Sequence, residues 1–326
     1  MNSAKRLDSN IDVERSKIQL HSLLENVGRV IIGKNEQIKL IIAAWLSGGH
    51  ILIEDIPGTG KTVLVRALAK SVDVRFSRVQ FTPDLLPSDI LGVSVFDQKE
   101  NVFRFKPGPM FTTLLLADEI NRATPRTQSA LLECMSERQV TIDGCTYELS
   151  PLFCTIATQN PIDQLGTFSL PEAQLDRFMI KMSMGYPSAK DEISLVKNQN
   201  FIHPLDELQA VMNESDLLNL RAAVPQIFIS DELYRYAVNL IGKSRSMPEV
   251  RLGCSPRATL AICRGAQALA LFEGYDYVKP KHLQEMAVPV MCHRLILKAE
   301  AKMSGLNAQS VVEKIIALTG VPVKKS

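Results

Sequence analysis

The run from His50 to Lys70 constrains the fold of this chain more than any other stretch. It begins with the apolar run HILIE, passes through DIPGTGKT and continues as VLVRALAK, whose apolar residues have helical spacing. Gly-Lys-Thr between a buried strand and a helix is typical of a phosphate-binding loop, because glycines let the backbone N–H groups turn toward a phosphate. The run therefore predicts an α/β fold with a parallel sheet and a ligand at the carboxyl ends of its strands.

The loop departs from the strict phosphate-loop pattern at one position. That pattern has a glycine five residues before Gly60, where this chain has Asp55. Gly58 and Gly60 still give the backbone its freedom, while Pro57 stiffens the turn. We expect Asp55 to orient the loop from the strand end without facing the phosphates. The alternative is a glycine-rich turn that carries a surface lysine.

Length, charge and composition exclude several classes of protein. A chain of 326 residues predicts one large domain and a smaller one, and a net charge of +2 gives no general attraction to nucleic acid or anionic membranes. The N-terminus has no apolar core of a signal peptide, and the run IKLIIAAWL is far shorter than the ~20 residues of a spanning helix. The six cysteines include no C-x-x-C, and the five histidines form no cluster near them. We expect a soluble, reduced, cytoplasmic protein without structural zinc.

The remaining apolar runs predict two domains. Strand-like runs at 74–80, 113–117, 153–158 and 178–182, with a helical pattern at 126–138, indicate a parallel sheet wrapped by helices. From residue 191 onward the chain has successive helical patterns, with helix starts at Ser230 and at Ser255-Pro256. We therefore predict a nucleotide-binding core with an N-terminal helix over residues 1–188 and an all-α domain over 189–326.

A pair of carboxylates follows the strand at 113–117. Asp118 and Glu119 would lie at the sheet edge that faces the phosphate loop, where phosphoryl transfer needs charge neutralisation. We expect Lys61 to reach the β- and γ-phosphates, Thr62 to ligate Mg²⁺ and Asp118 to hold the metal through a water. Glu119 would act as the general base on the attacking water. The alternative is an ordinary strand that ends in two surface acids.

Three further polar residues stand where a nucleotide site would use them. Asn160, in ATQNP at the end of the next strand, could hold the attacking water, although Asn-Pro also starts turns. Arg177 precedes the last strand, far from its own loop, and could act in trans as an arginine finger in a neighbouring subunit. The alternative is a surface pair with Asp176, which would contribute little. Arg257, at the start of a helix in the second domain, is a candidate for touching the γ-phosphate.

Two segments of the first domain alternate like β-hairpins. The run VSVFDQKENVFRF lies between Gly92 and Pro109 and interrupts the helix that follows the second strand. Residues 139–147 place Asp-Gly between two strand-like arms, which is a strong hairpin signal. Either the hairpins contact a partner, or they only cover the sheet edge.

Taken together, EDIPGTGKT, LLLADEINRA, ATQNP, LPEAQLDRF and CSPRATLAI resemble the MoxR family of AAA+ ATPases. The resemblance runs from about Ile31 to about Leu271 and implies an AAA+ phosphate-loop core, with two β-hairpin insertions, followed by a helical lid. It implies Walker A residues at Lys61 and Thr62 and Walker B residues at Asp118 and Glu119. It also implies sensor one, the arginine finger and sensor two at Asn160, Arg177 and Arg257. The segment 30–33 resembles the one that packs on adenine, so the implied nucleotide-binding residues are Ile32, Gly33, Pro57, Gly58, Thr59, Gly60, Lys61, Thr62 and Val63.

For function, the resemblance implies an ATP hydrolase that requires Mg²⁺. The resemblance implies a hexameric ring in which each site is built at a subunit interface. In ring ATPases of this kind the hairpins face the pore or a partner. The family implies a chaperone-like machine that remodels or matures partner proteins or metalloenzyme complexes, together with a separate protein carrying a von Willebrand factor A domain. The alternatives are an ATP-dependent binding switch with little turnover and a DNA-handling AAA+ ATPase. Nucleic acid is not expected as a partner, because few basic residues accompany Arg104 and Lys106 near the first hairpin.

Overall fold

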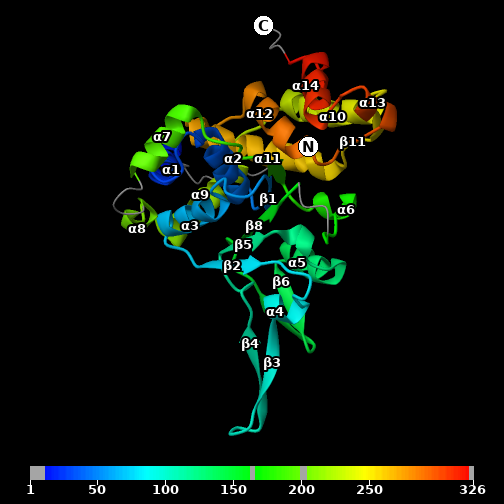
Figure 1. Cartoon of the computed structure of the whole chain (residues 1–326). Helices are drawn as coiled ribbons and strands as arrows, with labels where there is room; N and C mark the ends of the chain where they lie inside the picture. The colour runs from blue at the N-terminus through cyan, green and yellow to red at the C-terminus, as the bar shows by residue number, and fades with distance from the viewer. Residues whose placement is uncertain (1–11, 162–165, 199–203, 323–326) are drawn as a thin grey trace, which may run out of the picture.

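The computed structural model describes residues 12–161, 166–198 and 204–322, and a five-stranded sheet lies at its centre (Figure 1). All neighbouring strands pair in parallel. The order differs from the order in the sequence, because β8 lies between β1 and β5. In spatial order the strands are β2 (Phe76–Gln80), β5 (Leu114–Asp118), β8 (Cys154–Gln159), β1 (Ile51–Glu54) and β9 (Ile180–Met182). Each of them overlaps a run that predicts a strand, and the predicted α/β fold class is confirmed.

The two faces of the sheet bury two separate cores. Leu114 and Leu116 belong to one buried cluster and Leu115 and Ala117 to the other, because successive strand side chains point to opposite faces. The first cluster includes residues of α1 (Val13–Gly28), α2 (Asn35–Leu46) and α3 (Lys61–Ser71). The second includes residues of α4 (Pro87–Leu91) and α5 (Pro125–Glu137). Burial on both faces explains why β1, β5 and β8 are continuous apolar runs.

After β9 the chain is mainly helical and is organised around α11 (Pro256–Glu273). This helix packs against α1, α2, α10 and α12, which joins the N-terminal helices to the C-terminal half. It begins with proline directly after Ser255, as predicted, and ends at Gly274 in the left-handed conformation. No helix in the described ranges is long and apolar enough to cross a bilayer. The other helices of this half are α7 (Ala189–Asn198), α8 (Pro204–Glu207), α9 (Glu214–Ala223), α10 (Asp231–Ser246), α12 (Pro280–Met291), α13 (Ala299–Met303) and α14 (Ala308–Leu318).

The helical half also contains a short sheet that the sequence patterns do not predict. Strands β10 (Val250–Leu252) and β11 (Ile296–Leu297) pair antiparallel with an irregular register. Such short strands lack the alternation that would reveal them in sequence. We propose a boundary near residue 188, between the last strand of the large sheet and α7.

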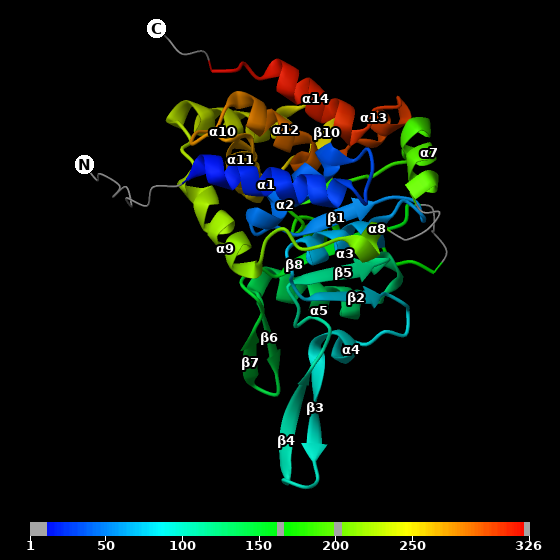
Figure 2. The same ribbon diagram turned by 90° about the vertical axis from the view of Figure 1, so that its left-hand side faces the viewer.

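Both predicted hairpins are present and project from the same side of the molecule (Figure 2). The longer one joins β3 (Gly92–Asp97) to β4 (Val102–Pro107), directly after α4. The shorter one joins β6 (Gln139–Ile142) to β7 (Cys145–Glu148). Its turn residues Asp143 and Gly144 have φ angles of 49° and 79°, and two positive φ angles are what the Asp-Gly signal predicts.

Candidate active site

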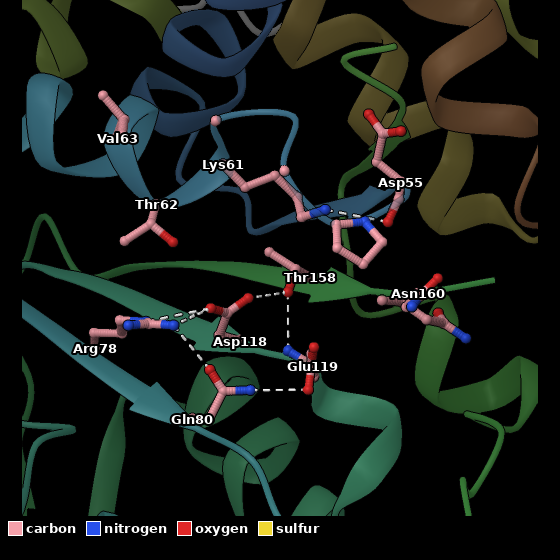
Figure 3. Close-up of a pocket in the computed structure, with 14 residues that line it drawn as sticks. Asp55, Lys61, Thr62, Val63, Arg78, Gln80, Asp118, Glu119, Thr158 and Asn160 are labelled. Atoms are coloured by element: carbon pink, nitrogen blue, oxygen red, sulfur yellow. Dashed lines mark hydrogen bonds and ion pairs between the residues drawn. The ribbon is translucent and has the colours of Figure 1, made fainter. Parts of the chain in front are cut away.

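The strand order brings the separate motifs of the sequence to one cavity. Because β8 lies between β1 and β5, the carboxyl ends of these three strands meet at the same edge of the sheet. The phosphate loop follows β1, Asp118 and Glu119 are at the end of β5, and Asn160 follows β8. These residues line a cavity of about 380 Å³ together with Lys61 and Thr62 (Figure 3).

Two glycines keep the phosphate loop open. Gly58 and Gly60 have φ angles of 83° and 81°, in the left-handed region that side chains rarely adopt. A Cβ atom at either position would meet no atom within 4 Å, so the loop borders free space. A phosphate group fits this concave backbone, since α3 starts at Lys61 and directs its N-terminus there.

The Lys61 ammonium group lies against its own loop. Its Nζ donates to the carbonyl oxygen of Asp55 at 3.1 Å and to that of Ile56 at 2.6 Å. Partial burial lowers the pKa of Lys61, and the nearby Asp55, Asp118 and Glu119 oppose this shift. Burial is the larger of these effects, and the Lys61 ammonium group has to leave two carbonyl oxygens to contact a phosphate.

Asp55 stands where the general pattern has glycine, and it hydrogen-bonds the loop to residues that directly follow the neighbouring strand. Its Oδ1 accepts from the Ile56 N–H at 2.9 Å, and its Oδ2 accepts from the N–H groups of Met184 and Gly185 at 2.9 and 2.8 Å. The latter two residues follow β9, the strand beside β1. The buried carboxylate thus holds the start of the loop against the exit of the adjacent strand. This agrees with a role in orienting the loop.

Replacing Asp55 with asparagine is expected to weaken ATP binding about tenfold, because an uncharged amide is a weaker acceptor for these N–H groups. Binding of a fluorescent ATP analogue measures the effect. Asp73→Asn is the matched control, because Asp73 is exposed and has a φ of 50°, which asparagine tolerates. Equal affinities of the two variants would contradict this role of Asp55.

Asp118 and Glu119 are held by residues of the neighbouring strands (Figure 3) and by Arg122, three residues after Glu119. Asp118 accepts from Arg78 at 2.8 and 3.2 Å and from the Thr158 hydroxyl at 2.6 Å. Glu119 accepts from Gln80 at 2.9 Å and from Arg122 at 3.0 Å, and its own N–H donates to Thr158 Oγ1. With these donors around them, both acids belong to one hydrogen-bonded group at the sheet edge.

Sequence reasoning missed Arg78 and Gln80. They are two residues apart on β2, so their side chains share a face, and Gln80 is in register with Asp118 on β5. Arg78 also donates to Gln80 Oε1 at 2.9 Å, which links the partners of the two acids. The signal was present, because the run at 74–80 alternates, but only the pairing of β2 with β5 identifies what the polar residues face.

The oxygen atoms at this edge fit a small divalent cation. The Thr62 hydroxyl and the Asp118 carboxylate line the same cavity, and Mg²⁺ prefers such hard oxygen ligands. Arg78 now supplies the positive charge beside Asp118, so a cation bound there would compete with this ion pair. Burial of Asp118 behind Arg78 and Thr158 indicates a carboxylate that requires a positive partner.

The structure does not bring all predicted site residues into the cavity. Asn160 is buried and lines it. Arg177 is half-buried and does not line it, and its side chain makes no hydrogen bond or ion pair within the described part of the chain. The Arg257 side chain is 65% exposed and reaches Asp176 at 3.8 Å instead. The lid arginine therefore does not point at the phosphate loop in this structure.

A second cavity lies on the other side of the loop. It has a volume of about 350 Å³, and Val30, Ile31 and Ile32 line it together with Thr59 and Val63. Its mainly apolar wall suits a flat base such as adenine, which the segment 30–33 implies. Gly33, with a φ of 74°, does not line this cavity but lies against Asp191, whose Oδ2 would be 2.3 Å from an added Cβ atom. The positive φ angle and this close approach both favour glycine at position 33.

Comparison with known proteins agrees with this geometry. Residues 50–180 match the ATPase family associated with various cellular activities (AAA), and residues 242–315 match the AAA lid domain. The chain is 37% identical to Chaperone MoxR1 of Mycobacterium tuberculosis over 93% of this chain and 83% of the relative. It is 31% identical to Protein MoxR of Paracoccus denitrificans over 82% of this chain and 86% of the relative. The chain belongs to the MoxR family of AAA+ ATPases.

Two further proteins resemble this MoxR-family chain over nearly its full length. An uncharacterized protein of Bacillus subtilis, YeaC, is 46% identical over 94% of this chain and 97% of the relative. The crystal structure of a provisionally assigned ATPase from Cytophaga hutchinsonii aligns with a TM-score of 0.88 at 37% identity. That alignment covers 95% of this chain and 97% of the other.

Proposed function

We propose that this MoxR-family chain is a Mg²⁺-dependent ATP hydrolase, and that it works as a ring-forming, chaperone-like machine on other proteins. The observation that carries the proposal is the convergence of Lys61, Asp118 and Glu119 on one cavity from two distant segments of the chain. Phosphoryl transfer depends on positioning and charge stabilisation, and these residues offer a cation, a metal ligand and a base at one place.

Five residues of the cavity have a role in this proposal. Lys61 neutralises the β- and γ-phosphates, while Thr62 and Asp118 hold Mg²⁺. The bound metal supplies further positive charge to the phosphate oxygens. Glu119 accepts a proton from the attacking water, which Asn160 orients. The bonds from Gln80 and Arg122 to Glu119 mean that the base has to be released before it works.

A site shared between subunits accounts for Arg177. Its guanidinium is outside the cavity of its own chain, and an arginine finger acts on the phosphates of a neighbour. We propose a homohexamer in which Arg177 completes the adjacent site. Arg257, which is exposed at the start of α11, would reach the γ-phosphate of its own site after a movement of the lid.

The exposed side chains of the long hairpin indicate that the client of this ATPase is a protein rather than DNA. Phe103 near its tip is 72% exposed, and its ring lies 5.1 Å from that of the exposed Phe96. Lys99, Arg104 and Lys106 are the basic residues of this hairpin, and Arg104 already pairs with Asp97 at 3.4 Å and with Glu100. Exposed aromatic rings suit contacts with polypeptide, whereas a paired arginine has little charge left for phosphates.

The membership of the MoxR family supports a proposal for the partner and for the compartment. We propose that the chain acts in the cytoplasm on proteins or metalloenzyme complexes that require maturation, together with a separate partner that carries a von Willebrand factor A domain. The name of the relative in Mycobacterium tuberculosis, Chaperone MoxR1, supports the chaperone-like role.

Turnover per subunit tests the shared site. We expect specific ATPase activity to rise with protein concentration, since a separate subunit lacks the finger of a neighbour. Phosphate release is measured across a hundredfold or wider concentration range, with ring formation followed by light scattering. Turnover that is independent of concentration would contradict a shared site, and ATP binding without turnover would favour the binding switch.

A further inference from the structure

Asp176, the residue directly before Arg177, connects the core to the lid. It follows α6 (Glu172–Leu175), which lies beneath the lid helices in Figure 1. Its Oδ1 accepts from Arg294 Nε at 2.7 Å, and the Ser255 hydroxyl is 3.1 and 3.3 Å from its two oxygens. Arg257 Nη1 is 3.8 Å from Oδ2. Three residues of the lid therefore meet at one carboxylate beside the proposed finger.

Arg294 fixes the backbone on both sides of Arg177. Its Nη2 donates to the carbonyl oxygens of Asp176 and Phe178 at 3.1 and 2.7 Å, and its Nη1 donates to that of Met179 at 3.0 Å. Only 4% of the Arg294 side chain is exposed. His293 adds a contact to the Phe178 carbonyl oxygen at 3.1 Å. The segment that carries Arg177 is thus anchored by its backbone, which leaves the Arg177 guanidinium available to another chain.

The two arginines that share Asp176 are held very unequally. Arg294 is buried, makes a short charged hydrogen bond and uses its planar fork on several acceptors at once. Arg257 is 65% exposed, and its 3.8 Å contact is an ion pair of the kind that solvent weakens. One partner is therefore a fixed anchor, and the other can leave at small cost.

We propose that Asp176 and Arg294 are positioning residues for the finger Arg177. Because Arg257 also contacts Asp176, a nucleotide bound in a subunit's own site changes the position of the Arg177 side chain that this subunit places in its neighbour's site. This inference rests on the proposed function, in which Arg177 acts in trans and Arg257 reaches the γ-phosphate. When Arg257 turns to a bound phosphate, Asp176 loses one of its two cations. Of the two arginines, only Arg294 then still holds the segment that carries Arg177.

Asp176→Asn tests the positioning role, because asparagine keeps the shape and an acceptor oxygen but loses the charge. We expect ADP to bind as in the wild type and turnover of the pure variant to fall at least about tenfold, a part of the effect of a complete finger. Mixing with Lys61→Ala subunits should restore turnover, because the Asp176→Asn subunit retains its own phosphate loop and borrows an intact finger. A variant that merely lost lid packing would show no such rescue.

The second half of the inference predicts a change in ATP affinity. Asp176→Asn frees Arg257, so ATP should bind a few-fold more tightly while ADP, which lacks the γ-phosphate, binds unchanged. Equal ATP affinity of variant and wild type would overturn the role of Arg257. Glu300→Gln is the matched control, because it removes one exposed lid carboxylate, and it should change neither measurement.

Two mixtures separate failure of this inference from failure of the proposed function. If Arg177→Ala is rescued by Lys61→Ala subunits but Asp176→Asn is not, the positioning role is overturned and the trans finger stands. If neither variant is rescued, the shared site itself is wrong. Thermal unfolding of each variant shows whether it is folded, and Arg294→Lys, which keeps the charge but not the fork, should lose turnover as Asp176→Asn does.

Discussion

Replacing Glu119 with glutamine is expected to reduce ATP turnover at least about 100-fold while ATP and Mg²⁺ still bind, because general-base catalysis typically contributes two to four orders of magnitude. The amide cannot take a proton from the attacking water. It can still accept the hydrogen bond that Gln80 donates to Glu119, so the shape of the site should survive. The variant therefore separates binding from chemistry.

Two measurements check this expectation. Steady-state phosphate release gives the loss of turnover, and binding of a fluorescent ATP analogue shows whether affinity is kept. Glu133→Gln is a suitable control, because Glu133 is an exposed carboxylate on α5 outside the cavity and its loss should leave both values unchanged. Normal turnover of Glu119→Gln would remove Glu119 from the role of base.

Features that depend on neighbouring residues in the sequence could be predicted. The phosphate loop requires glycines at 58 and 60 between a buried strand and a helix, and the structure has positive φ angles at both. The Asp143-Gly144 pair likewise predicts a turn with two positive φ angles, which the structure has. β1, β5 and β8 could be located because they are buried on both faces and are therefore uninterrupted apolar runs, and β2 could be located because its run alternates.

Features that depend on pairing between distant segments could not be predicted. Nothing in the apolar runs says that β8 lies between β1 and β5, and this order decides that Asn160 lines the same cavity as Lys61. The same holds for Arg78, whose role depends on the register of β2 with β5. The Asp176–Arg294 contact joins residues more than a hundred positions apart, and the short lid sheet has too few residues to show a period.

Asp55 shows how a local and a distant requirement meet at one residue. The general loop pattern calls for glycine, which would leave the N–H groups of Met184 and Gly185 without their carboxylate acceptor. The sequence indicated an orienting role, but only the position of β9 beside β1 supplies the groups that Asp55 orients. The departure from the pattern is therefore a consequence of the neighbouring strand.

Arg177→Ala is expected to bind nucleotide almost normally and to lose at least about 100-fold in turnover, since an arginine finger contributes roughly three to five orders of magnitude in related phosphoryl transfer. Binding is kept because Arg177 does not line the cavity of its own chain. Lys61→Ala should fail for the opposite reason, since its own loop loses the cation that meets the phosphates. Each variant alone is thus inactive, with a different half of the shared site missing.

Mixing these two variants decides between a finger that acts in trans and one that acts within its own chain. In a ring of randomly mixed subunits, about a quarter of the interfaces combine an intact loop from Arg177→Ala with an intact finger from Lys61→Ala, because each interface is formed head to tail. Turnover should therefore rise well above that of either variant and pass through a maximum near equal amounts. If Arg177 acted on its own site, no interface could be complete, and no mixing ratio would exceed the weighted sum of the two variants. Persistent absence of rescue, with ring formation intact, would leave Arg177 with a structural role beside Asp176.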